Sequence, residues 1–472
     1  MAEDCKGDGR PVRRGRIPEL KGAGVGRALT ENPVDDEITR FLRAHPDLEG
    51  VELLISDLGG VLRGKWAPPQ SLAKAATTGV NFPLSIFGLD VWGREVPDCG
   101  LHVLSGDEDG FCRLAPGSVR VVPWAKRPTA QAILSMWTVT GEPFVGDPRQ
   151  QLRRAVERLA ALGLRAVVAF ELEFYLTDLS CERANRPADG PERQNVYALS
   201  DLSDHGDFFT AVRGNGLTQG LPLDTIVSEG AAGQFEVNLK HRADPFAAAD
   251  DAVMLRRLVT ETARHHGLRA TFMAKPYIER NGSGMHVHVS LVDGEGRNVF
   301  ADAVTGETRL GAAIGGLIEA MVPSTLLFIP TWNGFRRLAP GSYAPTRAAW
   351  GRNNRTVAVR VPASEPAARR IEHRVAGADA NPYLVLAAVL DAMADGLERD
   401  LRAPPAVEAN GYDAPAPPLP ATMAEAIGLF ERSDFVRRAF GTEFRKLFAA
   451  VKGAERAAFE AEISPLERST YQ

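Results

Sequence analysis

The chain has 472 residues, which is too long for one ordinary hydrophobic core, so two domains are expected. Hydrophobic residues make up 44% and charged residues 24%, and the formal net charge of −5 gives no basic field that would favour nucleic acid. The four cysteines have no metal-knuckle spacing and no apolar run suggests a membrane span, so neither a disulfide scaffold nor a membrane protein is expected.

The N-terminal part of the chain predicts a tail followed by a small β-rich domain. Residues 1–36 mix Gly, Pro, Lys and Arg without the apolar segment of a secretory signal. This composition predicts a disordered tail and a cytoplasmic protein. Order is expected from residue 37, and residues 51–57 alternate like a strand that Gly59 and Gly60 turn into a hairpin.

The rest of the chain alternates strand-like and helical patterns. Helical spacing of apolar residues predicts helices over 148–163, 246–266 and 382–397. Strands are predicted over 166–176, 234–240, 285–291 and 356–361. A loop rich in Pro and Ala is predicted over 404–420, and a charged helical tail over 422–462. The order of elements favours an α+β fold, with a β-rich domain over 37–130 and a large second domain over 131–472.

Acidic residues lie on strands that otherwise look buried. Glu171 and Glu173 are two residues apart, so on a strand they share one face. A second pair, Glu229 and Glu236, flanks a bend that contains glycine. One Glu-x-Glu pair alone more often marks the solvated side of a sheet.

Two further segments add histidine and arginine to the acids. In residues 282–291, one strand face carries His286, His288 and Ser290. In residues 369–374, one face carries Arg370, Glu372 and Arg374. The second segment by itself could be a solvated charge run. Crowded carboxylates are tolerated when cations neutralise them, and carboxylates with one imidazole suit Mg²⁺ or Mn²⁺. Since arginines suit phosphate groups, the four segments together predict a metal site with a phosphate-like ligand.

Five segments also occur in the order seen in a known family. They are FELEF (170–174), GQFEV (233–237), NGSGMHVH (281–288), NRTVAVRVP (354–362) and RRIEHR (369–374). In these segments the chain resembles the glutamine synthetases, from about residue 38 to beyond residue 400. The resemblance implies a β-grasp-like N-terminal domain and a catalytic domain built as an antiparallel half-barrel. It also implies a dodecamer of two hexameric rings, with each active site shared between neighbouring subunits.

The resemblance assigns roles to individual residues. The ligands of a first metal would be Glu173, Glu229 and Glu236, and those of a second would be Glu171, His286 and Glu372. The glutamate-binding residues would be Asn281, Gly282, Arg337 and Arg374. The contacts to ATP would be His288, Ser290, Arg355, Arg360 and Arg370. The implied reaction uses ATP and two or three Mg²⁺ or Mn²⁺ ions per site to form γ-glutamyl phosphate, which an amine then attacks; Arg337, Arg355 and Arg374 would be the catalytic residues.

The chain departs from the glutamine synthetase pattern where ammonium would bind. Tyr343 occupies the place of a loop glutamate, and Leu84 lies nearest to the place of an aspartate from the neighbouring subunit. A small cation needs negative charge to replace its water, so losing both acids favours a larger amine. Ala367 replaces a lysine near the phosphate arginines. Tyr412 falls near a tyrosine that some bacterial relatives adenylylate, although a plain loop tyrosine is the simpler interpretation.

Three functions therefore stay open from the sequence. The segment SYAPT (342–346) resembles the γ-glutamylpolyamine synthetase branch, which predicts ligation of glutamate to a polyamine or a small monoamine. The second possibility is glutamine synthetase itself, acting on ammonia. The third is a non-catalytic structural or regulatory homologue, which the presence of all six expected metal ligands disfavours.

Overall fold

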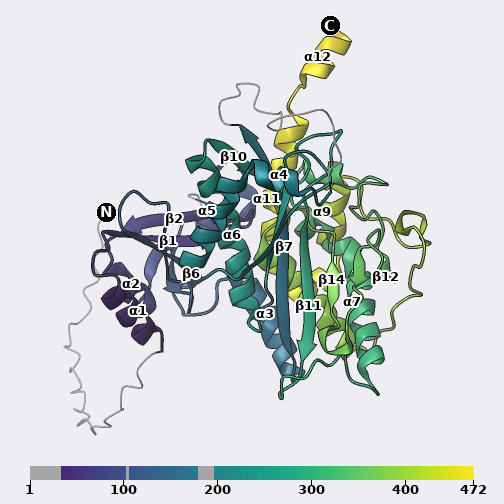
Figure 1. Ribbon diagram of the computed structural model, residues 1–472, viewed down its shortest axis with the longest axis horizontal. Coiled ribbons are helices and arrows are strands. Elements are labelled where there is room, and N and C mark those ends of the chain that lie inside the picture. The colour runs from purple at the N-terminus through teal and green to yellow at the C-terminus, as the bar shows by residue number, and fades with distance from the viewer. Residues whose placement is uncertain (1–32, 103–105, 179–195) are drawn as a thin grey trace, which may run out of the picture.

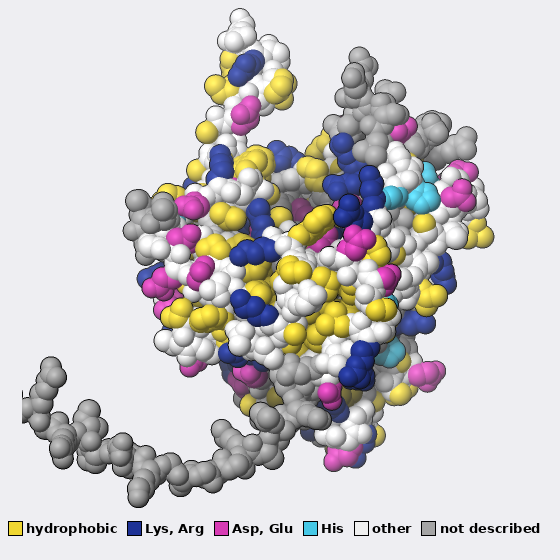
Figure 2. Space-filling view, turned by 90° about the vertical axis from the view of Figure 1, so that its left-hand side faces the viewer, with side chains coloured by type: hydrophobic (Ala, Val, Ile, Leu, Met, Phe, Trp, Pro, Cys, Tyr) yellow, Lys and Arg dark blue, Asp and Glu magenta, His cyan; other side chains and the backbone are white. Residues whose placement is uncertain are grey.

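The computed structural model describes residues 33–102, 106–178 and 196–472, which form two β-sheets with helices packed around them (Figure 1). The predicted disordered tail at 1–36 lies outside the described residues up to residue 32. Its last four residues belong to helix α1 (Pro33–Ala44), so order begins slightly before the predicted position. Basic and acidic side chains are interspersed over the face shown in Figure 2.

The first sheet has the strand order β2-β1-β6-β4-β3, with β5 also paired to β6. In chain order its strands are β1 (Gly50–Ser56), β2 (Leu62–Ala67), β3 (Val80–Pro83), β4 (Asp109–Leu114), β5 (Arg120–Val121) and β6 (Thr129–Trp137). The predicted hairpin is confirmed: β1 and β2 pair antiparallel, and Gly60 at the turn has φ +78°. Because β6 runs parallel to β1 inside this sheet, we propose that the domain boundary follows Trp137, not residue 130.

The second sheet is larger and curls into a half-barrel in an α+β fold, as the resemblance implied. Its path is β12-β13-β14-β11-β7-β9-β8, with β10 on β7. The strands are β7 (Arg165–Asp178), β8 (Leu223–Ser228), β9 (Gln234–Leu239), β10 (Leu268–Thr271), β11 (Met285–Val292), β12 (Trp350–Arg352), β13 (Val359–Val361) and β14 (Ile371–His373). Its paired strands are antiparallel except β12 with β13. Three predicted strands are confirmed, whereas the fourth shortens to β13 because residues 355–358 form turns and bends.

The other described α-helices follow α1 in chain order. They are α2 (Ser71–Ala76), α3 (Pro148–Ala161), α4 (Leu199–Asp204), α5 (Gly206–Thr218), α6 (Pro245–His265), α7 (Gly306–Phe328), α8 (Pro382–Glu398), α9 (Met423–Arg432), α10 (Asp434–Phe440), α11 (Thr442–Glu460) and α12 (Pro465–Tyr471). The three helices predicted before residue 400 are confirmed as α3, α6 and α8. The single tail helix was wrong, because Ser433 caps α10 and Gly441 takes φ +85°, which divides the segment into α9, α10 and α11.

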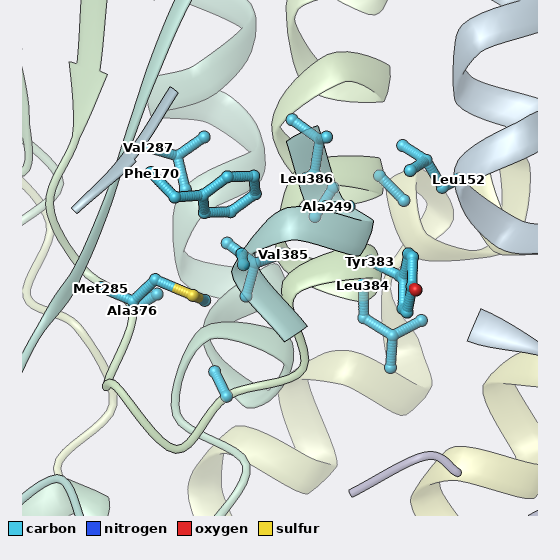
Figure 3. Close-up of a cluster of buried hydrophobic side chains, with 14 of the residues drawn as sticks. Leu152, Phe170, Ala249, Met285, Val287, Ala376, Tyr383, Leu384, Val385 and Leu386 are labelled. Carbon is cyan, nitrogen blue, oxygen red and sulfur yellow. The ribbon is translucent and has the colours of Figure 1, made fainter. Parts of the chain in front are cut away.

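Alternation along the strands separates an apolar face from a polar face. Phe170 on β7 and Val287 on β11 are fully buried and point toward Val385 and Leu386 on α8 (Figure 3). Burying large apolar side chains on one face stabilises the sheet by roughly 2 kcal/mol for each residue. The intervening residues, Glu171 among them, are therefore held on the opposite face by the same strand geometry.

Helices α7 and α8 approach closely through glycine. A Cβ built on Gly316 would lie 2.0 Å from the carbonyl oxygen of Ala392, and one on Gly396 would lie 2.1 Å from that of Ala312. By length and hydropathy α7 is the one described helix that could cross a membrane, a run that the sequence analysis did not detect. Since 72% of its most apolar window is buried inside the protein, α7 serves as a core helix.

Candidate active site on the concave face of the half-barrel

Three glutamates form the first acidic group. Glu173 on β7 lies directly opposite Glu236 on β9 in the antiparallel register. Glu229 follows the end of β8, and its backbone N–H donates to the carbonyl of Gln234 at 2.8 Å, which closes the turn between β8 and β9. A ligand oxygen from each of the three carboxylates lies within 4.8 Å of the others. This is the set that the resemblance assigned to a first metal.

The second group joins three neighbouring strands. Glu171 on β7 lies opposite His286 on β11, and His288 on β11 lies opposite Glu372 on β14. Oε2 of Glu171 lies 3.3 Å from Nδ1 of His286, and its Oε1 lies 2.9 Å from Nε2 of His288. His286 Nδ1 lies 3.9 Å from Glu372 Oε1. His286 of the predicted second set thus lies near both Glu171 and Glu372, while ligand atoms of Glu171, His288 and Glu372 lie within 4.8 Å of one another.

The two histidines differ in their hydrogen bonds. Nε of Arg370 donates to Nδ1 of His288 at 3.1 Å, so a neutral His288 carries its proton on Nε2, facing Glu171. A protonated nitrogen cannot ligate a metal. His286 presents Nδ1 to the acids and meets no such donor among the described residues, so it is the better ligand.

Burial and like charge act on the first group. Burial, followed by the charge of Glu173, raises the pKa of Glu229 to about 8. Burial, followed by the charges of the neighbouring carboxylates, raises the pKa of Glu236 well above its ordinary value. Ionising all three carboxyls together is therefore unfavourable, and a divalent cation would offset that cost.

Cationic neighbours act on the second group. Burial opposes ionisation of Glu372, but the charge of Arg374 outweighs it and lowers the pKa to about 2. Burial likewise opposes ionisation of Glu171, but hydrogen bonds from His286 and His288 hold its pKa below the ordinary range. Carboxylate oxygens with one imidazole are the ligand set of a hard divalent cation, so the residues present fit Mg²⁺ or Mn²⁺.

Arginines surround the second group. Nη1 of Arg360 donates to Glu372 Oε2 at 2.7 Å, and its Nη2 donates to Asn353 Oδ1 at 3.0 Å. Arg374 donates to the other oxygen of Glu372. Asn353 has φ +48°, a left-handed conformation that Asn tolerates better than most residues. Asn353 and Glu372 together fix the plane of the Arg360 guanidinium.

Backbone and amide groups orient Glu173. The N–H of Gly284 donates to Glu173 Oε2 at 2.7 Å, and Gln234 Nε2 donates to the same oxygen at 3.4 Å. Gln234 also donates to the carbonyl of Gly282 at 3.1 Å. Arg337 is 4% exposed and donates to Val375 O at 2.8 Å. These contacts connect the first acidic group to the segment that the resemblance assigned to glutamate.

Two adjoining cavities contain the site. The larger, of about 1190 Å³, is lined by residues that include Ser290, Asp224, Arg297 and Ala367. The smaller, of about 560 Å³, is lined by four glutamates and by residues that include Tyr343; the glutamates are Glu171, Glu173, Glu229 and Glu236. Both cavities share the lining residues Glu171, Asn238, His288 and Arg370. A ligand in the larger cavity can therefore contact a ligand in the smaller cavity beside these four shared residues.

Most predicted site residues lie in these two cavities. The smaller cavity holds the predicted glutamate residues Asn281, Gly282, Arg337 and Arg374, together with Tyr343, Arg355 and Arg360. Leu84 lines neither cavity in a single chain, and its predicted place in a neighbouring subunit stays a prediction. Tyr412 lies in a short turn where its carbonyl accepts from Arg347 Nε at 2.8 Å, and it is half-buried beside Ser342.

The sequence analysis missed four residues of the site. Val196, Tyr197 and Gln234 line the smaller cavity, and Asn353 holds Arg360. For Gln234 a signal was available, because it precedes Glu236 by two and so shares its strand face. Nothing in the sequence pattern singled out Val196, Tyr197 or Asn353.

Comparisons with known proteins agree with this geometry. Residues 145–471 match the family model described as glutamine synthetase, catalytic domain. The chain is 40% identical over 453 residues to gamma-glutamylputrescine synthetase of Escherichia coli K12, covering 94% of each chain. It is 33% identical to glutamate–isopropylamine ligase of a Pseudomonas species, covering 88% of this chain and 93% of the other. A solved structure described as a GmaS/ADP complex superposes with a TM-score of 0.80 at 28% identity, covering 93% of this chain and 99% of the other.

Proposed function

The chain belongs to the glutamine synthetase family and is a ligase, and from this premise we propose that it joins the γ-carboxylate of glutamate to an organic amine in a reaction driven by ATP. One observation carries the proposal. Six potential metal ligands from five strands and loops converge beside arginines at the junction of two cavities. Such a set of acids and arginines serves phosphoryl transfer to a carboxylate.

The acids would hold two divalent cations. Glu173, Glu229 and Glu236 would hold one, on the side of the smaller cavity. Glu171, His286 and Glu372 would hold the other, at the boundary between the cavities. Bound there, the cations would offset negative charge on the ATP phosphates and on the glutamate carboxylate. Mg²⁺ and Mn²⁺ both suit these ligands.

The smaller cavity suits glutamate and the larger suits ATP. Arg337 and Arg374 are buried and rigidly placed, so they can hold a carboxylate against the polar groups of Asn281 and Gly282. Ser290 and Arg370 line the larger cavity, which has room for a nucleotide. ATP placed with its phosphates toward Glu171 would present its γ-phosphate to the glutamate side chain.

The reaction then has two steps. A γ-carboxylate oxygen of glutamate forms a bond to the γ-phosphorus of ATP as the bond to ADP breaks, which gives γ-glutamyl phosphate. The amine nitrogen, having lost a proton, attacks the acyl carbon, and inorganic phosphate leaves. Arg355 and Arg360 would stabilise the charge on the transferred group in both steps. Water must be excluded, because it would hydrolyse the acyl phosphate.

The nucleophile that the cavity favours is an organic amine. Tyr343 lies on its wall and is 62% exposed, in the place where a glutamine synthetase carries an acid. The carboxylates that do line the smaller cavity are those of the two metal groups. Ammonium would therefore lack a negative partner, whereas the carbon chain of an amine would contact the tyrosine ring and the neighbouring apolar residues. The names of the relatives, which act on putrescine and isopropylamine, support the same class.

Assembly and location follow from the family as part of the proposal. We expect a homo-oligomer, a dodecamer of two hexameric rings in which a neighbouring subunit completes each site, working in the cytoplasm. The short helix α12 projects from the body of the protein in Figure 1 and carries the exposed side chains of Leu466 and Tyr471. An isolated chain leaves these apolar groups in water, which fits a contact with another subunit.

Phosphate release tests the function. Wild-type protein is given ATP, glutamate and Mg²⁺ or Mn²⁺, and then putrescine, spermidine, ethanolamine, isopropylamine or ammonium, and the γ-glutamyl product is identified by mass spectrometry. We expect release that needs glutamate and is highest with one of the organic amines. Saturation by millimolar ammonium alone would show glutamine synthetase activity instead. No release with any nucleophile would indicate a non-catalytic homologue.

A further inference from the structure

Two tyrosines in the smaller cavity have a strained backbone. Tyr197 has φ +62° and Tyr343 has φ +58°. Five described non-glycine residues have positive φ, and the other three are Asp or Asn, which tolerate the left-handed conformation. Both bulky residues with this conformation line the same cavity. Strain of this kind persists where the surrounding structure enforces it, and it is concentrated at functional sites.

Tyr197 is anchored through its backbone, and Tyr343 through the neighbouring Ser342, beside groups that the proposed reaction uses. The N–H of Tyr197 donates to the carbonyl of Ser228 at 2.9 Å, and Ser228 directly precedes Glu229. Next to Tyr343, the hydroxyl of Ser342 donates to the carbonyls of Arg337 and Ala339, at 3.1 Å and 2.6 Å. These hydrogen bonds connect the loop of Tyr197 to the first acidic group. They connect the loop of Tyr343 to Arg337, which the resemblance assigned to glutamate binding.

Neither ring is explained by packing in the core. Tyr197 is 59% exposed and Tyr343 is 62% exposed, so neither belongs to the hydrophobic core. Among the described residues, neither tyrosine side chain forms a hydrogen bond. Val196, next to Tyr197, adds an exposed apolar side chain to the same cavity. The two exposed aromatic rings are therefore available to bind a ligand in this cavity.

The chemistry of this surface suits a cation at the end of a carbon chain. The faces of aromatic rings attract ammonium groups, and an apolar wall suits methylene groups. The acids that line this cavity all belong to the proposed metal groups, so none of them is spare for a second ammonium group. Aromatic faces are then the groups available to replace its water.

We propose that Tyr197 and Tyr343 form a paired aromatic site that binds the distal ammonium group of a diamine while its other nitrogen attacks the acyl phosphate. The inference rests on the proposed amine ligation and names the substrate class of that site. The preferred nucleophile is an aliphatic diamine, and a monoamine of equal length lacks the group that the rings hold.

The test compares putrescine with n-pentylamine, which has the same number of chain atoms and one charge fewer. KM and kcat are measured for wild type, Tyr197→Leu, Tyr343→Leu and the matched Phe variants. Each Leu variant should raise KM for putrescine about 3- to 30-fold and leave KM for n-pentylamine nearly unchanged. Each Phe variant keeps the aromatic face and should restore the wild-type KM. Leu217→Ala, at an exposed side chain on α5 outside both cavities, is the control.

The outcomes separate this inference from the proposed function. Equal effects of the Leu variants on the two amines, or no effect on either, would overturn the paired aromatic site and leave amine ligation intact. Preference for aniline over putrescine would also overturn it, since the rings would then be stacking on an aromatic amine. Wild-type protein that releases no phosphate with any amine would overturn both proposals.

Discussion

Glu173 and Glu236 are direct cross-strand neighbours in the β7–β9 ladder, so two carboxylates face each other on the concave side of the half-barrel. Like charges in this position destabilise a sheet. Glu236 is 8% exposed, and the described residues offer the two carboxylates no lysine or arginine ion pair. The repulsion between the two carboxylates therefore destabilises the fold, and a bound cation would relieve it.

Replacing one member of this pair should separate activity from stability. Glu236→Gln should lower amine-dependent phosphate release at least about 10³-fold, because the first metal would lose a ligand while the fold loses a repulsion. The melting temperature without metal should stay the same or rise, and the oligomer should stay assembled. Phosphate release, calorimetry and light scattering measure these effects, with Glu460→Gln on α11 as the control. Collapse of the oligomer would mean that Glu236 is a structural residue.

The stability of the metal-free protein should fall as the pH rises. The pKa of Glu229 is raised to about 8 in the folded chain, so between pH 6.5 and 8.5 the folded state binds more protons than the unfolded state. The contribution of Glu229 to the free energy of unfolding is complete below its pKa in the unfolded chain. It is lost as the pH rises through its pKa in the folded chain. Over this window the loss should be about 1–2 kcal/mol for one group.

Glu229→Gln is the matched variant for that measurement. Denaturant unfolding without metal should show a shallower decline between pH 6.5 and 8.5 in the variant than in wild type. Excess Mn²⁺ should stabilise wild type more at pH 8.5 than at pH 6.5, because the carboxylates bind the ion when deprotonated. Identical pH slopes in the variant and wild type would contradict the assignment of the raised pKa to Glu229.

The sequence was most informative where side chains alternate along long strands. Period-two patterns in 166–176 and 285–291 located β7 and β11 and placed Glu171 with Glu173, and His286 with His288. Register could not be read from one chain, so the pairing of Glu171 with His286 and of Glu173 with Glu236 needed the structure. Short strands such as β13 and the capped breaks in the C-terminal helices carry too few residues for a clear period.

The backbone conformation of individual loop residues could not be predicted from the sequence either. Tyr197, Tyr343 and Asn353 matter through positive φ, which depends on hydrogen bonds from distant segments and leaves no composition signal. Tyr343 was found only by its place in a resemblance, and Tyr197 was not found. The family resemblance predicted that five glutamates and His286 converge, whereas it did not predict the hydrogen bond from Arg370 that distinguishes His288 from His286.

Restoring an acid at Tyr343 should change the nucleophile. Tyr343→Glu should increase phosphate release with ammonium relative to organic amines, because a carboxylate can replace part of the hydration of NH₄⁺. The ratio of kcat/KM for ammonium and putrescine measures this directly, with Tyr343→Gln as the isosteric control. An unchanged ratio would count against the argument that the missing acid sets the amine preference.

The contact of α7 with α8 should tolerate no added methyl group. Gly316→Ala should lower the free energy of unfolding by about 1–3 kcal/mol, because its Cβ would meet the Ala392 carbonyl at 2.0 Å. Gly311, on the same helix, has no atom within 4 Å of a built Cβ. Gly311→Ala should therefore stabilise by about 1 kcal/mol through helix propensity. Equal effects of the two substitutions in denaturant unfolding would show that the helices are not in close contact there.

The transfer of oxygen from glutamate to phosphate tests the central claim most directly. Glutamate labelled with ¹⁸O in its γ-carboxylate is turned over with ATP, Mg²⁺ or Mn²⁺ and the best amine, and the phosphate released is analysed by mass spectrometry. Formation of γ-glutamyl phosphate predicts one ¹⁸O atom in each phosphate, together with a γ-glutamylamide that keeps the other. Phosphate that carries no label would contradict the account, because the carboxylate would then not have attacked ATP.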